Sequence, residues 1–181
     1  MITCGWLKSG AVLSVILGLG GCVSVEKERV PRALAPLDFV RFCMDYRSEC
    51  RSGQPEAVIA LTPETERVIA EVNAAVNRRI QPVTSTAAWR IDPLSGNCND
   101  YVVTKRHELM ARGLPASALL IATARTARGE AHLLLVLRTD RGERVLDNLT
   151  DEVLPPARTS FTWLTRQSSA DPNVWETMAS G

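Results

Sequence analysis

The second half of the chain contains three residues, in separate segments, that together could perform thiol catalysis: Cys98, His132 and Asp147. Cys98 lies in the segment SGNCNDYVVTKRHELMARGLP, at the start of a predicted helix. In the first turn of a helix, unpaired backbone N–H groups and the positive end of the helix dipole stabilise a thiolate, and the same groups can hold an oxyanion. The segment therefore predicts a reactive thiol.

Thiolate catalysis usually requires an imidazole beside the sulfur, and the chain has two histidines. His107 follows Cys98 by about two and a half helical turns, so it should project from the other side of the helix as a surface polar residue. His132 occupies a position in the strand-like run EAHLLLVL where alternation calls for an apolar residue. An isolated histidine is more often a satisfied core residue, but the free thiol favours a catalytic role for His132.

A third group should orient the imidazole, and Asp147 lies in the run RVLDNL. A turn or strand-end aspartate is the alternative interpretation. A two-residue hairpin loop would place Asp151 opposite His132 and leave Asp147 about 13 Å away along its strand. A three-residue loop, Asp140–Gly142, would put His132 and Asp147 on opposite faces. The sequence thus permits a Cys–His–Asp triad only with a bulge or another register.

An amphipathic helix without a chemical role is predicted in the segment LTPETERVIAEVNAAVNRRIQP. Thr62 can cap it, Pro63 suits its first position and Pro82 ends the pattern. Its apolar residues recur at helical spacing and should pack on a core: Val68, Ile69, Val72, Ala75, Val76 and Ile80. Residues 83–96 follow as a predicted loop around Trp89, which we expect to fill the core.

The helix that begins at Cys98 should have one apolar side, and Gly113 and Pro115 should end it. The apolar side comprises Val102, Val103, Leu109 and Met110. The charged residues expected mostly opposite are Lys105, Arg106 and Glu108.

Three strand-like runs come next: Ser117–Arg125, Ala131–Thr139 and Glu143–Leu149. Their connections, TARGE and DRG, are short and contain glycine, which predicts antiparallel hairpins. The fold class is therefore α+β, with N-terminal helices followed by an antiparallel sheet. A chain of 181 residues that is 45% hydrophobic can form one domain with a substantial core. Its net charge of +1, with scattered basic residues, argues against nucleic acid as a partner.

The first residues resemble a targeting signal. Lys8 precedes an apolar run, Ala11–Leu19, of the length of a signal-peptide core. The run ends in LGGC, which resembles a bacterial lipoprotein signal with Cys22 as the lipidated residue; ordinary cleavage a few residues later is the alternative. We therefore expect a signal peptide at 1–22, a tether at 23–36 and a single domain at 37–178. Either form of processing exports the protein, and the lipid would attach it to a membrane.

Export makes disulfide formation relevant to the remaining cysteines. Cys43 and Cys50, in FCMDYRSEC, are the natural pair. A continuous helix would separate their Cα atoms by about 10 Å, which is too far for a disulfide, so a bridge predicts that the chain bends between them. The alternative is two unpaired, half-buried cysteines. In the bridged form Cys98 is left as the free thiol.

Several blocks in matching order resemble the bacterial transglutaminase-like cysteine proteinases, in particular their LapG-type periplasmic branch. The resemblance runs from about Pro36 to Trp175 and includes FC, EC, LTPE, VNAAVNRRI, GNCNDYVVTKR, GLPASALLI, AHLLLVLRTDRG, VLDNL and RQSSADPNVW. It implies a papain-like fold with Cys98 as nucleophile, His132 as general base and acid, and Asp147 as the orienting carboxylate.

The cysteine motif departs from the family pattern. The family usually has Gly-Asp-Cys-Glu-Asp, whose acids help to bind calcium in the LapG-type branch, whereas this chain has Asn97 and Asn99 at two of those positions and keeps Asp100. Losing two carboxylates removes much of the attraction for Ca²⁺. We therefore expect no required cofactor and no tight calcium site. Fewer negative charges beside Cys98 should also favour its thiolate.

Together these features predict an exported cysteine peptidase that cleaves a protein or peptide, with a cell-surface adhesin as the substrate that the resemblance implies. Acyl transfer to an amine and amide hydrolysis use the same chemistry and stay open. The alternative is a catalytically inactive lipoprotein of the same fold that binds a peptide or partner, with the altered cysteine motif as the mark of lost activity.

Overall fold

A computed structural model describes residues 31–84 and 88–178 of the chain. The predicted signal peptide at 1–22, the lipidation candidate Cys22 and the start of the tether lie outside the described residues. Within the described ranges, no helix has the length and apolar character needed to cross a membrane.

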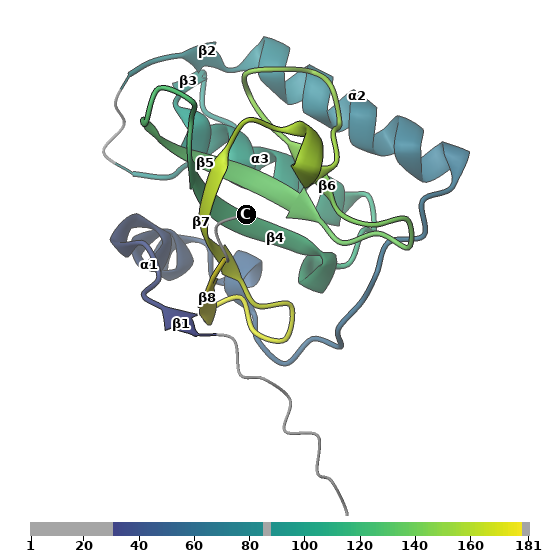
Figure 1. Ribbon diagram of the computed structural model, residues 1–181, viewed down its shortest axis with the longest axis horizontal. Helices are drawn as coiled ribbons and strands as arrows, with labels where there is room; N and C mark the ends of the chain where they lie inside the picture. The colour runs from purple at the N-terminus through teal and green to yellow at the C-terminus, as the bar shows by residue number, and fades with distance from the viewer. Residues whose placement is uncertain (1–30, 85–87, 179–181) are drawn as a thin grey trace, which may run out of the picture.

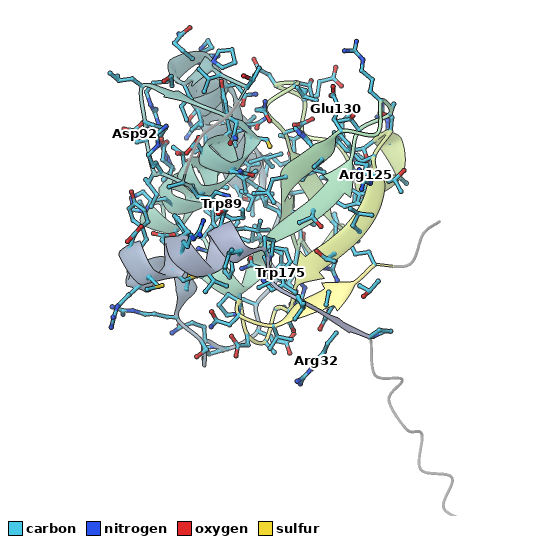
Figure 2. The ribbon with its side chains drawn as sticks, turned by 90° about the vertical axis from the view of Figure 1, so that its left-hand side faces the viewer. Arg32, Trp89, Asp92, Arg125, Glu130 and Trp175 are labelled. Atoms are coloured by element: carbon cyan, nitrogen blue, oxygen red, sulfur yellow. A yellow bond between two sulfur atoms is a disulfide. The ribbon has the colours of Figure 1, made fainter. Side chains whose placement is uncertain are left out.

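Within the residues that the structure describes, three α-helices lie on one side of an antiparallel sheet (Figures 1 and 2). The helices are α1 (Leu37–Asp45), α2 (Pro63–Arg79) and α3 (Cys98–Ala111). Short 3₁₀ helices accompany them: η1 (Arg47–Cys50), η2 (Ala116–Ala118) and η3 (Pro156–Arg158). The predicted α+β class is confirmed.

The main sheet has the strand order β1-β8-β7-β4-β5-β6. Its strands are β1 (Arg32–Ala33), β8 (Trp175–Thr177), β7 (Thr162–Gln167), β4 (Leu119–Arg125), β5 (Ala131–Leu137) and β6 (Arg144–Leu146). The three predicted runs form β4, β5 and β6, which are neighbours and make up the half of the sheet that ends at β6. The other three strands were not predicted. A separate parallel pair joins β2 (Gln81–Pro82) to β3 (Ser95–Gly96), so the predicted loop at 83–96 ends in a short strand.

Helix α2 begins as predicted. The Thr62 side chain accepts a hydrogen bond from the Thr65 N–H, and Pro63 occupies the first helical position. Four of its predicted apolar positions are at most 1% exposed: Ile69, Val72, Val76 and Ile80. This buried side packs on α3, so α2 forms the outer layer over the helix that carries Cys98.

The prediction of a charged side on α3 is wrong. Lys105 is 0% exposed and Arg106 is 3% exposed, because α3 lies between α2 and the sheet and packs against β5. Each buried cation has a partner from a distant segment. Lys105 Nζ donates to the Asp147 carbonyl at 2.8 Å, and Arg106 pairs with Glu49 at 3.1 Å. Glu108, the third residue of the predicted charged side, is half-buried and pairs with Arg79 and Arg112.

The Cys43–Cys50 disulfide is present, with a Cα–Cα distance of 5.6 Å. The bend that it requires lies at Tyr46, between the end of α1 and the start of η1. Nearby, the ring of Phe39 lies 6.0 Å from Trp89. Trp89 is 4% exposed, which confirms its predicted place in the core.

The hairpin between β5 and β6 has a register that neither predicted loop allows. Leu135 pairs with Leu146 and Leu137 with Arg144, so the connection is the six residues 138–143. The chain is diverted there because Thr139 bridges to Ile59 and the Asp140 carboxylate accepts the Leu61 N–H at 3.0 Å. Extending this register places Asp147 opposite Leu134, diagonal to His132 and on the same face. Diagonal neighbours lie within reach of long side chains.

Candidate active site

Cys98 occupies the first position of α3, directly after the N-cap Asn97. The Asn97 side chain accepts a hydrogen bond from the Asn99 N–H at 3.1 Å, and the Asp100 carboxylate accepts one from the Asn97 N–H at 3.0 Å. This reciprocal pair is a capping box. Among the described cysteines Cys98 is the free one, and it is half-buried. The thiol is thus held in the first helical turn, as predicted.

Asp100 also fixes the chain that precedes the thiol. It is 0% exposed, and its second oxygen accepts the Arg90 N–H at 2.8 Å. A Cβ atom at Gly96 would lie 2.6 Å from the Asp100 Cβ, which is closer than real contacts allow. Glycine at position 96 therefore lets the strand β3 pass close to the carboxylate that positions Cys98.

His132 and Asp147 form a buried contact. Nε2 of His132 lies 2.7 Å from Oδ1 of Asp147, and each side chain is 7% exposed. Burial lowers the pKa of His132, but hydrogen bonds and negative charge from Asp147 and Cys98 outweigh it and raise the pKa to about 9. Since Nε2 faces Asp147, Nδ1 is the ring nitrogen left for Cys98. The structure therefore brings the three predicted residues together.

The ring of Phe161 stacks on the His132 imidazole, with centroids 5.3 Å apart and an interplanar angle of 20°. Phe161 precedes β7, so sequence reasoning missed it together with that strand. Nothing near Phe161 in the sequence marks it as a neighbour of His132, which lies in another strand. The Phe161 ring therefore covers one face of the buried imidazole.

Sequence reasoning also missed the donors that hold the Asp147 backbone. Besides Lys105, Asn77 of α2 donates through Nδ2 to the Asp147 carbonyl at 3.1 Å. The same Asn77 nitrogen lies 2.8 Å from a carboxylate oxygen of Asp151. Both helices therefore contact the segment that carries Asp147.

His107 lies apart from this site. Its Nδ1 lies 2.7 Å from a carboxylate oxygen of Glu49, and its side chain is 47% exposed. Its position agrees with the expected surface role and with the geometric argument that it does not face Cys98.

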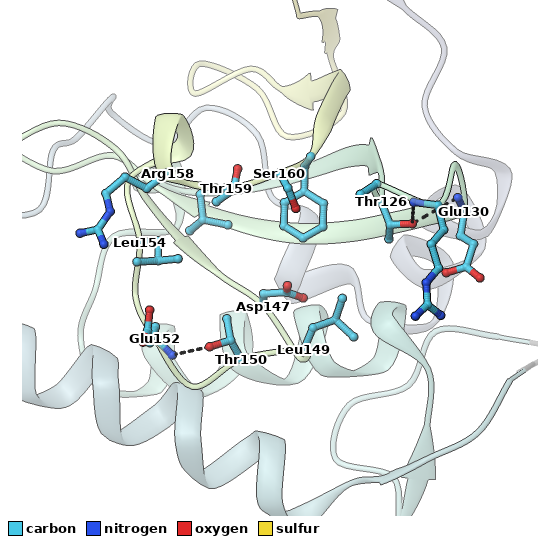
Figure 3. Close-up of a pocket in the computed structure, with 14 residues that line it drawn as sticks. Thr126, Glu130, Asp147, Leu149, Thr150, Glu152, Leu154, Arg158, Thr159 and Ser160 are labelled. Atoms are coloured by element: carbon cyan, nitrogen blue, oxygen red, sulfur yellow. Dashed lines mark hydrogen bonds between the residues drawn. The ribbon is translucent and has the colours of Figure 1, made fainter.

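A cavity of about 500 Å³ borders the carboxylate side of the His132–Asp147 pair (Figure 3). Figure 3 shows Asp147 in its middle, between Leu149 and Ser160. The lining combines apolar, hydroxyl and charged residues: Thr126, Ala127, Arg128, Glu130, Val145, Asp147, Leu149, Thr150, Glu152, Leu154, Arg158, Thr159, Ser160 and Phe161. A cavity of this size can accommodate peptide side chains.

The residues at the calcium-motif positions do not fit a calcium site. The Asn97 side-chain oxygen accepts the Asn99 N–H, and both Asp100 oxygens accept backbone N–H groups. Ca²⁺ takes six to eight oxygen ligands, and carboxylates supply most of the attraction. In the described part of the chain, no group of three or more His, Cys, Asp and Glu residues could hold a metal ion.

A family model described as bacterial transglutaminase-like cysteine proteinase matches residues 30–181. Among solved structures, calcium-bound LapG of Legionella pneumophila is 19% identical, with 80% of each chain covered and a TM-score of 0.56. EGTA-treated LapG of the same organism is 18% identical over 78% of this chain and 77% of that chain, with a TM-score of 0.55. No curated protein matches the sequence significantly. The structural likeness shows a LapG-like, transglutaminase-like fold.

Proposed function

Because the chain belongs to the bacterial transglutaminase-like cysteine proteinases, we propose that it hydrolyses peptide bonds through Cys98, His132 and Asp147. The observation that carries this proposal is the 2.7 Å contact between the His132 ring and Asp147, beside a free thiol at the start of α3. A nucleophile, a base within reach and a group that orients the base are the parts of covalent catalysis.

In the proposed reaction the Cys98 thiolate attacks the scissile carbonyl carbon, and the C=O electron pair moves to the oxygen. The cap occupies the Asn99 N–H, so the Cys98 N–H is the first-turn donor available to the oxyanion. Collapse of the intermediate breaks the C–N bond while His132 protonates the leaving amine. Water, deprotonated by His132, then hydrolyses the thioester.

The pKa of His132 predicts how peptide hydrolysis depends on pH. With that pKa raised to about 9, the imidazole is protonated at neutral pH and can give its proton to the leaving amine. We expect kcat/KM to fall as the pH rises through about 9, because the imidazole of the free enzyme then loses that proton. Initial rates on a fluorogenic peptide mixture between pH 6 and pH 10.5 measure this loss of activity at high pH. A rate that declines from pH 7 onward would contradict the role of protonated His132 as the general acid.

The proposal is tested by iodoacetamide alkylation of Cys98 between pH 5 and pH 9, followed by mass spectrometry of the Cys98 peptide. We expect fast labelling that persists well below pH 8, because the imidazolium of His132 stabilises the thiolate. In His132→Ala, labelling should lose this reactivity at low pH and rise with pH as for an ordinary thiol. Ordinary labelling in both proteins would reject the thiol hydrolase and favour the partner-binding alternative.

The family supports a protein substrate, and we propose a periplasmic or cell-surface protein such as an adhesin. This rests on the expected export signal and the proposed lipid on Cys22, which would keep the enzyme at a membrane. The proposed reaction needs no cofactor, since the residues at the motif positions do not fit calcium, although one LapG structure is calcium-bound. An amine could also attack the thioester in place of water and take the acyl group, with release of the Cys98 thiolate. Acyl transfer is therefore the same proposal with another acceptor.

A further inference from the structure

Lys105 is a fully buried lysine whose amine points to the proposed active site. Its side chain is 0% exposed, and Nζ donates to the Asp147 carbonyl at 2.8 Å. Nζ also lies 5.9 Å from the centre of the Tyr101 ring. The proposed reaction above makes no use of this amine.

The place of Lys105 in α3 relates it to the thiol. It follows Cys98 by seven residues, which is about two helical turns, so both lie on the same side of the helix. One rigid element therefore carries the nucleophile at its start and, about 10 Å further along, the amine that contacts Asp147. A shift of α3 would move both ends of the triad together.

The backbone carbonyl of Asp147 needs a side-chain hydrogen-bond donor, because Asp147 lies beyond the end of the strand pairing and has no partner strand there among the described residues. The ladder between β5 and β6 ends at the pair Leu135 and Leu146, one residue before Asp147. The Asp147 carbonyl instead accepts hydrogen bonds from Lys105 and, at 3.1 Å, from Asn77. Asp147 is 5% exposed, so without these donors its carbonyl would be buried and unpaired.

Burying the Lys105 amine costs desolvation free energy that an apolar side chain in the same space would not. Burial lowers the pKa of Lys105 to about 7, although the negative charges of Asp147 and Asp151 raise it in part. A methionine would fill most of the same volume without burying a charge. The contact with the Asp147 carbonyl is therefore what the lysine adds over an apolar residue.

We infer that Lys105 is a positioning residue, which holds the Asp147 backbone so that its carboxylate orients His132 toward Cys98. This inference rests on the proposed function. It adds a fourth member to the machinery, one that acts through Asp147 and does not contact the substrate. The catalytic helix thereby sets both the thiol and the group that orients its base.

Lys105→Met in the full chain tests the inference, because it keeps the stem and removes the donor. We expect kcat on a fluorogenic peptide mixture to fall about 100-fold with little change in KM, since small displacements of catalytic groups have effects of this size. Cys98 alkylation at pH 6 should slow toward the rate of His132→Ala. The melting temperature should not fall in proportion, because removing a buried charge also removes its desolvation cost.

Thr104→Val is the matched control. Thr104 is also fully buried on α3, but its hydroxyl accepts the Asp92 N–H and does not contact Asp147. This variant should lose some stability and keep the wild-type labelling profile. Adding Lys105→Met to Asp147→Ala should cause no further loss, because the lysine acts through Asp147.

The outcomes separate the two proposals. If wild type labels as an ordinary thiol, the proposed function fails and this inference fails with it. If wild type labels fast at pH 6 and folded Lys105→Met labels equally fast with unchanged kcat, only the role of Lys105 is rejected. If Lys105→Met does not fold, the same measurements on Lys105→Gln decide whether Lys105 positions Asp147. The glutamine side chain stays polar but is too short to reach the Asp147 carbonyl.

Discussion

Cys98→Ser should lower kcat for peptide hydrolysis by about 10⁶-fold, the scale seen when a catalytic nucleophile is removed. A serine hydroxyl stays protonated beside His132, so the variant lacks the anion that the proposed attack needs. Cys98 is half-buried and serine is nearly isosteric, so the melting temperature should stay within about 2 °C of wild type. Hydrolysis of a fluorogenic peptide mixture and a thermal melt measure the two effects.

His107→Ala is the control for this prediction. His107 is the other histidine of the chain, and it contacts Glu49 on a different side of α3. Its removal should leave kcat within about twofold of wild type. If Cys98→Ser keeps more than about one per cent of the activity, or if His107→Ala abolishes it, the assignment of the nucleophile and its base is wrong.

Glu49→Gln should destabilise the fold by about 3 kcal/mol, because it leaves the Arg106 guanidinium buried without a counter-charge. Both side chains of this pair are 4% exposed, and Nη1 of Arg106 lies 3.1 Å from a carboxylate oxygen of Glu49. Burial lowers the pKa of Arg106, and Glu49 counteracts that shift. Urea unfolding measures the change in the free energy of unfolding.

An exposed ion pair supplies the comparison for Glu49. Glu64 and Arg67 lie 2.6 Å apart on α2, with side chains that are 71% and 55% exposed. Glu64→Gln should cost less than about 1 kcal/mol, because water screens that pair. Similar losses in the two variants would mean that the Arg106 charge is solvated on removal of its partner, and the predicted effect of burial would be rejected.

Local signals made part of this structure predictable. Thr62 and Pro63 mark the start of α2 because capping and a fixed proline φ depend on adjacent residues only. The start of α3 at Cys98 is local in the same way, since Asn97 and Asp100 form its cap within one turn. The chain bend between Cys43 and Cys50 followed from the reach of a disulfide.

The features that escaped prediction depend on distant segments. The six-residue hairpin connection exists because Ile59 and Leu61, far away in sequence, contact Thr139 and Asp140. Lys105 appeared to belong to a solvated side because its partner, the Asp147 carbonyl, is 42 residues away. Sequence periodicity carries no information on such pairings, so the contact of His132 with Asp147 could be proposed from residue types but not from the predicted register.

The short span of the disulfide has a consequence for oxidative folding. Cys43 and Cys50 are seven residues apart, whereas a bridge from either of them to Cys98 would close a loop of about 50 residues. Closing the longer loop costs about 2 kcal/mol more conformational entropy in the unfolded chain. This difference favours the native bridge and leaves Cys98 reduced when the domain folds.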